Sequence, residues 1–64
     1  MLGKNIKKLR KKKGLTQEKL AQLAGIPYAT LNKVEIGVHK QPRVGTVAKI
    51  AKALKVTIDK LVNG

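Results

Sequence analysis

Apolar residues recur at three- and four-residue intervals along most of the chain, and glycine or proline separates one periodic stretch from the next. This spacing places apolar side chains on one face of a helix, whereas a half-buried strand requires alternation at every second residue. No stretch alternates for long enough to indicate a strand. The pattern predicts an all-α protein, a compact bundle of five short helices.

Three predicted helices precede Pro42, and they cover residues 2–13, 16–24 and 27–36. The first ends at Gly14, because glycine commonly follows the last residue of a helix. The second has Thr16 as its candidate N-cap. The third starts at Pro27, whose fixed φ suits the start of a helix, and it stops before Gly37.

The last two predicted helices follow Pro42. The fourth keeps its apolar residues in helical phase, namely Val44, Val47, Ile50, Ala51 and Leu54. The fifth is only one or two turns long, with Thr57 as its cap and with Leu61 and Val62 as its apolar residues. A chain of 64 residues has room for one small core, so we take residues 1–64 as a single domain.

The composition limits how so short a chain is stabilised and where it resides. No cysteine is present, which excludes a disulfide and a thiolate metal site, so helix packing has to supply the stability. No apolar run approaches the roughly 20 residues of a membrane span, and the basic start lacks the apolar stretch of a secretory signal. We expect a cytoplasmic protein that makes no use of a membrane.

Positive charge dominates the chain and indicates a polyanionic partner. Fifteen lysines and arginines stand against three acids, Glu18, Glu35 and Asp59, which gives a formal net charge of +12. The alternative is that the charge serves solubility alone. The position of the charged residues has to decide between the two interpretations.

The junction between the second and third predicted helices is the most informative turn. About three residues around Gly25 join two short amphipathic helices. Glycine at a helix end commonly adopts the left-handed conformation, which makes the third helix cross the second instead of continuing it. This predicts a helix-turn-helix at about residues 16–36, with the third helix projecting from the body.

A helical wheel gives the third predicted helix two different faces. The inward side carries Pro27, Leu31 and Val34, and the outward side carries Ala29, Asn32, Lys33 and Ile36. Tyr28, the only aromatic residue, lies near the N-terminal end that a recognition helix presents to base edges. Apart from one isoleucine the outward side is small or polar, so it fits a DNA major groove.

Glu35 lies about 40° from Leu31 on the same wheel, nearer the core than the outward face. A carboxylate is rarely buried without a cation. Arg10, next to the apolar Leu9, is our candidate partner, because a guanidinium can hold a carboxylate with two hydrogen bonds. The alternative is a solvated glutamate that pairs loosely with any nearby lysine.

Several short motifs occur in the order and spacing of one known family: GLTQEKLA at 14–21, AGI at 24–26, Leu31, VEIG at 34–37, Pro42 and IAKAL at 50–54. With them the chain resembles the phage repressor and Cro-type helix-turn-helix family, the XRE-like regulators. The resemblance covers nearly the whole chain. It implies sequence-specific binding of double-stranded DNA by a transcriptional regulator, expected to be a repressor, with the helix at 27–36 in the major groove.

The resemblance also implies DNA contacts for eight residues: Gln17 on a phosphate, Tyr28, Ala29 and Lys33 at base edges, Thr30 and Asn32 beside them near base or backbone, and Lys40 and Arg43 on phosphates. In the family, the residue at the position of Gln17 also braces the reading helix. Arg10 and Glu35 match a structural ion pair of the family. For the eight contact residues, the alternative is an ordinary solvated surface position.

Three positions depart from the family pattern. Pro27 stands where a Ser or Thr commonly caps the reading helix, so we expect its first turn to be frayed or shifted. Ile36 replaces a residue that is often polar and directed at a phosphate. Lys55 stands where a glycine usually ends the fourth helix, at a cost of about 1 kcal/mol if that position is left-handed.

The expected partners are double-stranded DNA and a second copy of the chain, and no cofactor or metal is implied. Two copies would occupy half-sites about 34 Å apart on DNA, with a weak self-contact at residues 55–58 and the last helix. The alternative is an antitoxin of a toxin–antitoxin pair, which uses the same fold and adds a protein partner.

Two further classes are weighed against this interpretation. A purely electrostatic binder of RNA or of anionic membranes would use the seven basic residues between Lys4 and Lys13 and would ignore base sequence. An enzyme is not expected, because one histidine, three scattered acids and no thiol provide no set of acid, base and nucleophile.

Overall fold

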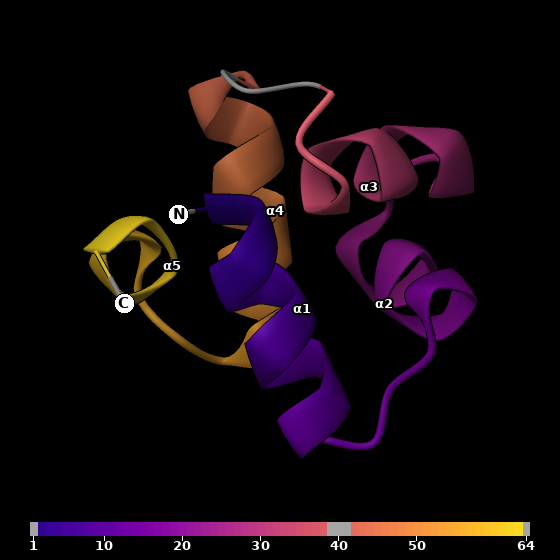
Figure 1. Cartoon of the computed structure of the whole chain (residues 1–64), viewed down its shortest axis with the longest axis horizontal. Helices are drawn as coiled ribbons and strands as arrows, with labels where there is room; N and C mark the ends of the chain where they lie inside the picture. Colours follow the sequence, from indigo (N-terminus) through magenta and orange to yellow (C-terminus); the bar gives the residue numbers. More distant parts are fainter. Residues whose placement is uncertain (1, 39–41, 64) are drawn as a thin grey trace.

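Five helices and no strand make up the part of the chain that the computed structural model describes, residues 2–38 and 42–63 (Figure 1). The helices are α1 (Leu2–Lys12), α2 (Gln17–Ala24), α3 (Tyr28–Glu35), α4 (Val44–Leu54) and α5 (Ile58–Asn63). The prediction of an all-α bundle of five short helices is confirmed.

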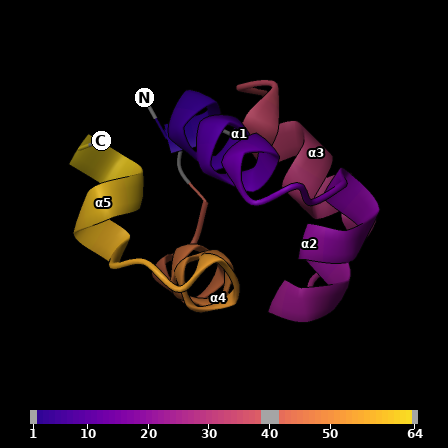
Figure 2. The same ribbon diagram turned by 90° about the horizontal axis from the view of Figure 1, so that it is seen from below.

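The two longest helices, α1 and α4, pass through the middle of the molecule, with α5 on one side and the α2–α3 pair on the other (Figure 2). In this arrangement α2 packs chiefly against α4, and α1 packs against both α3 and α5. The described chain measures only 22 × 20 × 19 Å. Because α3 lies at the edge, one of its faces stays open to solvent.

One apolar core holds the five helices together. Every helix contributes at least one completely buried large side chain, and these are Ile6, Leu20, Leu31, Ile50, Leu54 and Leu61. Full burial of such a side chain contributes roughly 1.5–3 kcal/mol relative to exposure. With no cysteine in the chain, this core is the main source of stability.

Four predicted helix boundaries differ from the structure, each by one residue: α1 ends at Lys12, α2 begins at Gln17, and α3 covers Tyr28–Glu35. Helix α1 ends at Lys12, one residue early, and Gly14 follows in the left-handed conformation with φ 70°. Helix α3 begins at Tyr28, because Pro27 has an extended ψ of 143° and is the N-cap residue. Pro27 is also exposed, so its predicted place on the inward face is wrong. The fixed φ of proline, here −62°, suits a cap as well as a first helical residue.

Lys55 ends α4 in a conformation that side chains rarely adopt. Its φ is 59° and its ψ is 41°, and it is the only residue besides glycine with a positive φ in the described part of the chain. The following Val56 N–H donates to Ala51 O at 3.0 Å, which completes the hydrogen-bond pattern usual after a left-handed helix end. A left-handed lysine costs roughly 1 kcal/mol or more.

The variant Lys55→Gly is expected to raise the free energy of unfolding by about 0.5–1 kcal/mol, because glycine removes the strain but increases the entropy of the unfolded chain. Lys52→Gly makes the same chemical change inside the last turn of α4, where it should lower the free energy of unfolding by about 0.5–1 kcal/mol. Urea unfolding of both variants measures the difference. Equal destabilisation by both would contradict this account of Lys55.

Gly3 sets how closely α1 approaches α3. A Cβ at this position would lie against the carbonyl oxygens of Val34 and Glu35, the latter at only 2.7 Å. Both atoms belong to the backbone at the end of α3, which a side-chain rotation cannot move aside. The contact therefore requires glycine for its small size, and nothing in the periodicity of the sequence indicates it.

Gly3→Ala is expected to lower the free energy of unfolding by about 1–3 kcal/mol, because α1 has to move away from α3 to admit the methyl group. Gly45→Ala is the matched control, since nothing lies within 4 Å of an added Cβ there and alanine favours a helix. Thermal and urea unfolding distinguish the two. A Gly3→Ala variant as stable as the parent would rule out the close approach.

Candidate nucleic-acid interface

The turn after α2 determines the direction of α3. Gly25 has φ 69° and ψ 34°, so the left-handed conformation expected at this glycine is present. The Ile26 N–H donates to Ala21 O at 3.0 Å and the Gly25 N–H to Gln22 O at 3.2 Å, which closes the end of α2. Helix α3 therefore leaves α2 at an angle and lies across it, as the predicted helix-turn-helix requires (Figure 1).

Helix α3 has one buried and one exposed face. Leu31 and Val34 face the core. The residues open to solvent on the opposite side are Tyr28, Ala29, Lys33 and Ile36, with Tyr28 50% and Ile36 62% exposed. Thr30 and Asn32 are half-buried between the two faces. Lys33 is the only charged residue on this exposed face.

The first turn of α3 forms without a side-chain cap. Pro27 provides no hydrogen-bonding side chain, yet its carbonyl oxygen accepts from the N–H of Thr30 at 3.1 Å and of Leu31 at 3.2 Å. The helix begins at the next residue, so the start is shifted by one position from the prediction. The N–H groups of Tyr28 and Ala29 have no partner within the helix and are available to an acceptor outside it.

Arg10 and Glu35 form a buried ion pair between α1 and α3. Arg10 Nε lies 2.9 Å from Glu35 Oε2, and Arg10 Nη2 lies 3.2 Å from Glu35 Oε1. Each residue is only 8% exposed. Arg10 Nη1 also donates to Leu15 O at 2.7 Å, so the guanidinium ties the loop before α2 to the same point. The structure thus brings together the two residues that the sequence pairs.

Gln17 extends this ion pair to the exposed end of α3. Its Nε2 donates to Glu35 Oε1 at 3.2 Å and to Asn32 Oδ1 at 3.3 Å, while its Oε1 accepts from the Tyr28 hydroxyl at 3.0 Å. Both amide hydrogens are therefore used inside the protein. The bracing role expected of Gln17 fits this geometry, but its side chain retains no free donor for a phosphate.

The contacts of Arg10, Glu35, Gln17 and Tyr28 form one continuous network from α1 through α2 to α3. No buried side-chain nitrogen or oxygen among the described residues lacks a hydrogen-bond partner. A polar network in a core is stabilising only when every member is satisfied in this way. The network therefore holds the aromatic ring at the start of α3 in a defined position relative to the body.

Arg10→Met is expected to lower the free energy of unfolding by about 3–5 kcal/mol, because it leaves the Glu35 carboxylate buried without a cation. Lys11→Met, one residue along on an exposed position, should change it by less than about 0.5 kcal/mol. Urea unfolding measures both, with TMAO to refold a variant that is unfolded in buffer. The double variant Arg10→Met with Glu35→Met should regain most of the loss, and an unchanged single variant would refute a stabilising pair.

The basic residues predicted to contact DNA divide into three cases. Lys33 is exposed in the last turn of α3. Arg43 is exposed and is the N-cap residue of α4. Its side chain makes no capping hydrogen bond. Lys40 falls within residues 39–41, outside the described part of the chain.

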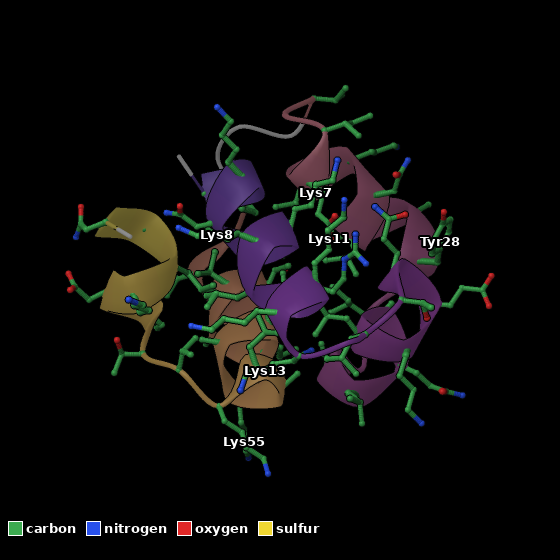
Figure 3. All side chains as sticks on the ribbon, turned by 60° about the horizontal axis from the view of Figure 1, so that its bottom comes forward. Lys7, Lys8, Lys11, Lys13, Tyr28 and Lys55 are labelled. Carbon is green, nitrogen blue, oxygen red and sulfur yellow. The ribbon has the colours of Figure 1, made fainter. Side chains whose placement is uncertain are left out.

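Two of the basic residues between Lys4 and Lys13, which the sequence pattern did not place beside α3, lie next to it. Lys7 and Lys11 are exposed on α1, and Figure 3 shows them on the side of α1 next to α3, whereas Lys8 extends toward α5. Their i, i+4 spacing, with Gly3 and Arg10 on the adjoining stripe of the helix, is the signal that places them there. They add positive charge next to the exposed face of α3.

The described residues contain neither a cluster of metal ligands nor a membrane-spanning helix. No three histidine, aspartate or glutamate side chains there lie together in the manner of metal ligands. No helix in that part combines the length and apolarity needed to cross a membrane.

The chain is similar to known helix-turn-helix proteins. A family model described as "Helix-turn-helix" matches residues 6–61. An uncharacterized HTH-type transcriptional regulator of Bacillus subtilis, RghRB, is 37% identical over 92% of this chain and 42% of its own length. Another, y4dJ of Sinorhizobium fredii, is 37% identical over 97% of this chain and 79% of its own length. The chain thus spans less than half the length of the first relative.

A solved structure provides a closer geometric comparison. The structure of SinR, described as the master regulator for biofilm formation, in complex with DNA superposes with a TM-score of 0.93 at 31% identity. The match covers 97% of this chain and 98% of the SinR chain. The arrangement of five helices is therefore the same in both proteins.

Proposed function

Because the chain belongs to the XRE-like helix-turn-helix family of transcriptional regulators, we propose that it binds specific double-stranded DNA sequences through α3 and regulates transcription. Its named relatives are regulators and not enzymes, in agreement with the prediction from sequence. The observation that carries the proposal is the exposed face of α3, held by the Arg10–Glu35–Gln17–Tyr28 network on a protein of net charge +12.

The proposed interface separates sequence reading from affinity. Lys33 donates to guanine O6 or N7 in the major groove, and Ala29 makes apolar contact with a thymine methyl group. Tyr28, held through its hydroxyl by Gln17, presents its ring edge near the base at the start of the helix. With only these three residues proposed at base edges, we expect modest discrimination between sequences.

Phosphate contacts provide most of the affinity in this proposal. Arg43 and the two lysines at the side of α3, Lys7 and Lys11, displace condensed counterions from the DNA backbone. The free N–H groups at the start of α3 are further donors to a phosphate. Lys40 stays a proposed phosphate contact. Because both amide hydrogens of Gln17 are used inside the protein, we assign the phosphate contact expected of Gln17 to these neighbouring donors instead.

We further propose that the protein acts in the cytoplasm as a repressor, by occupying a promoter. Two copies on half-sites about 34 Å apart would suit the symmetry common in helix-turn-helix regulators. The self-contact at residues 55–58 and α5 stays a prediction. So does a protein partner of the antitoxin kind, for which co-purification with a small toxic protein is the observation to seek.

Selection from a random double-stranded DNA library tests the central proposal. The enriched sequence and a scrambled duplex are then titrated with the protein over a range of salt concentrations. Sequence-specific binding requires clearly tighter binding of the enriched duplex at every salt concentration. Equal affinity for both duplexes, or for RNA, would instead establish an electrostatic binder.

Lys33→Ala and Arg43→Ala are expected to affect DNA binding in different ways. Lys33→Ala should lose about 1 kcal/mol of discrimination at one base pair, because a base contact is removed. Arg43→Ala should weaken all duplexes alike and reduce the magnitude of the slope of log K against log salt by about 1. Salt titrations on single-base-pair variants of the enriched duplex measure both effects. The reverse assignment, with Arg43 altering base preference, would contradict the proposed orientation.

A further inference from the structure

A second surface lies between the C-terminal ends of α2 and α4, in a groove of about 600 Å³. Its lining residues are Leu23, Ala24, Lys49, Lys52, Ala53 and Lys55. None of them belongs to α3, and Figure 3 shows Lys55 and Tyr28 at different edges of the molecule. The groove is thus separate from the proposed DNA-reading face.

The floor of the groove is apolar and partly open. Leu23 is 53% exposed although it belongs to a helix whose other leucine, Leu20, is completely buried. Ala24 is buried and Ala53 half-buried, so two small side chains leave space beside the leucine. A large apolar side chain from outside could pack on Leu23 beside these small residues.

The rim of the groove carries one sign of charge. Lys49 and Lys52 are exposed one turn apart on α4, and Lys55 follows at the left-handed end of the helix. No acidic side chain lines the groove among the described residues. Residues three apart on a helix, such as Lys49 and Lys52, are separated by a rise of about 4.5 Å along the axis. Acidic residues at i and i+3 or i+4 on a facing helix have a similar spacing, so they could pair with these lysines.

We propose that this groove binds an acidic amphipathic helix of a partner protein, with an apolar anchor on Leu23 and carboxylates on the three lysines. The mode is that of a helix lying in an apolar groove, with charge deciding which helices fit. A DNA backbone would satisfy the lysines but offers nothing to cover the leucine. The inference is independent of the DNA-binding function proposed above.

The occupied groove leaves α3 exposed, because the two sites share no residue. The protein would then hold DNA and a protein helix at the same time, on different faces of one small domain. This arrangement gives the left-handed Lys55 a role, since glycine at the same position would relieve the backbone strain but remove the third cation.

The test uses the full chain and a fluorescein-labelled helical peptide of about 15 residues, with leucine on one face and glutamate beside it. Fluorescence anisotropy measures the affinity, and NMR chemical shifts locate the site. We expect saturable binding, shifts at the groove residues, and persistence of binding when the enriched DNA is present. A peptide with glutamine in place of glutamate should bind about tenfold more weakly or worse.

Three variants separate the groove from general attraction to a basic protein. Leu23→Ser and Lys52→Glu should each weaken the peptide by about tenfold or more, while Lys8→Glu, the same charge change on α1, should weaken it by about twofold or less. Leu23→Ser should leave the DNA affinity unchanged. Because Leu23 is half exposed and Lys52 lies on the surface, both variants should fold, which circular dichroism confirms.

Several results would overturn the proposal. Equal loss with Lys52→Glu and Lys8→Glu would mean unspecific charge attraction, and weaker DNA binding by Leu23→Ser would make the groove part of the DNA site. Sedimentation showing a dimer that Leu23→Ser abolishes would assign the groove to a second copy of the chain. Binding to anionic phosphatidylserine vesicles that depends on Leu23, or no saturable peptide binding, would equally refute a protein helix as the occupant.

Discussion

The buried carboxylate of Glu35 is the constraint on which the arrangement of this protein depends. An ionised carboxylate taken out of water is strongly destabilising unless charge and hydrogen bonds compensate it. Here Arg10 and Gln17 supply both, and the three residues come from three different helices. Satisfying one carboxylate therefore fixes the mutual positions of α1, α2 and α3. The same contacts reach Tyr28, so the orientation of the exposed face of α3 follows from the requirements of the interior.

The distribution of charge follows from the same pair. Because Arg10 and Glu35 neutralise each other inside the protein, the whole excess of twelve positive charges belongs to the remaining residues. Little of it lies on the exposed face of α3, where Lys33 is the only charged residue. In the proposed interface, affinity for a polyanion and discrimination between sequences therefore rest on different residues. The proposed interface would gain affinity from lysines and an arginine beside α3 and read sequence with a small number of contacts on α3.

The domain presents several chemically different surfaces although it is small. With a core reached by all five helices and extents of about 20 Å, each helix has one face inside and one face available for a partner. Helix α3 offers a narrow face with few charges, the outer side of α1 offers lysines, and α2 with α4 offers an apolar groove edged by lysines. Strain appears at one of them, in the left-handed Lys55.

The sequence by itself determined the number and approximate extent of the helices, the left-handed turn at Gly25, the family and the partnership of Arg10 with Glu35. The helices and the turn depend on backbone periodicity and turn residues, which are local. The family depends on motifs that occur in a fixed order along the chain. The partnership of Arg10 with Glu35 depends on the inward side of a helix that Glu35 occupies and on the ion pair of the family. Tertiary structure alone decided that Pro27 caps α3 from outside, that the amide of Gln17 turns inward, and that Gly3 touches the end of α3. The contacts of Gln17 and Gly3 are choices between partners 11 to 32 residues apart in the chain and depend on fractions of an ångström in packing, which no local pattern records. The fixed φ of Pro27 suits an N-cap residue as well as a first helical residue, so its place depends on the backbone of the folded chain.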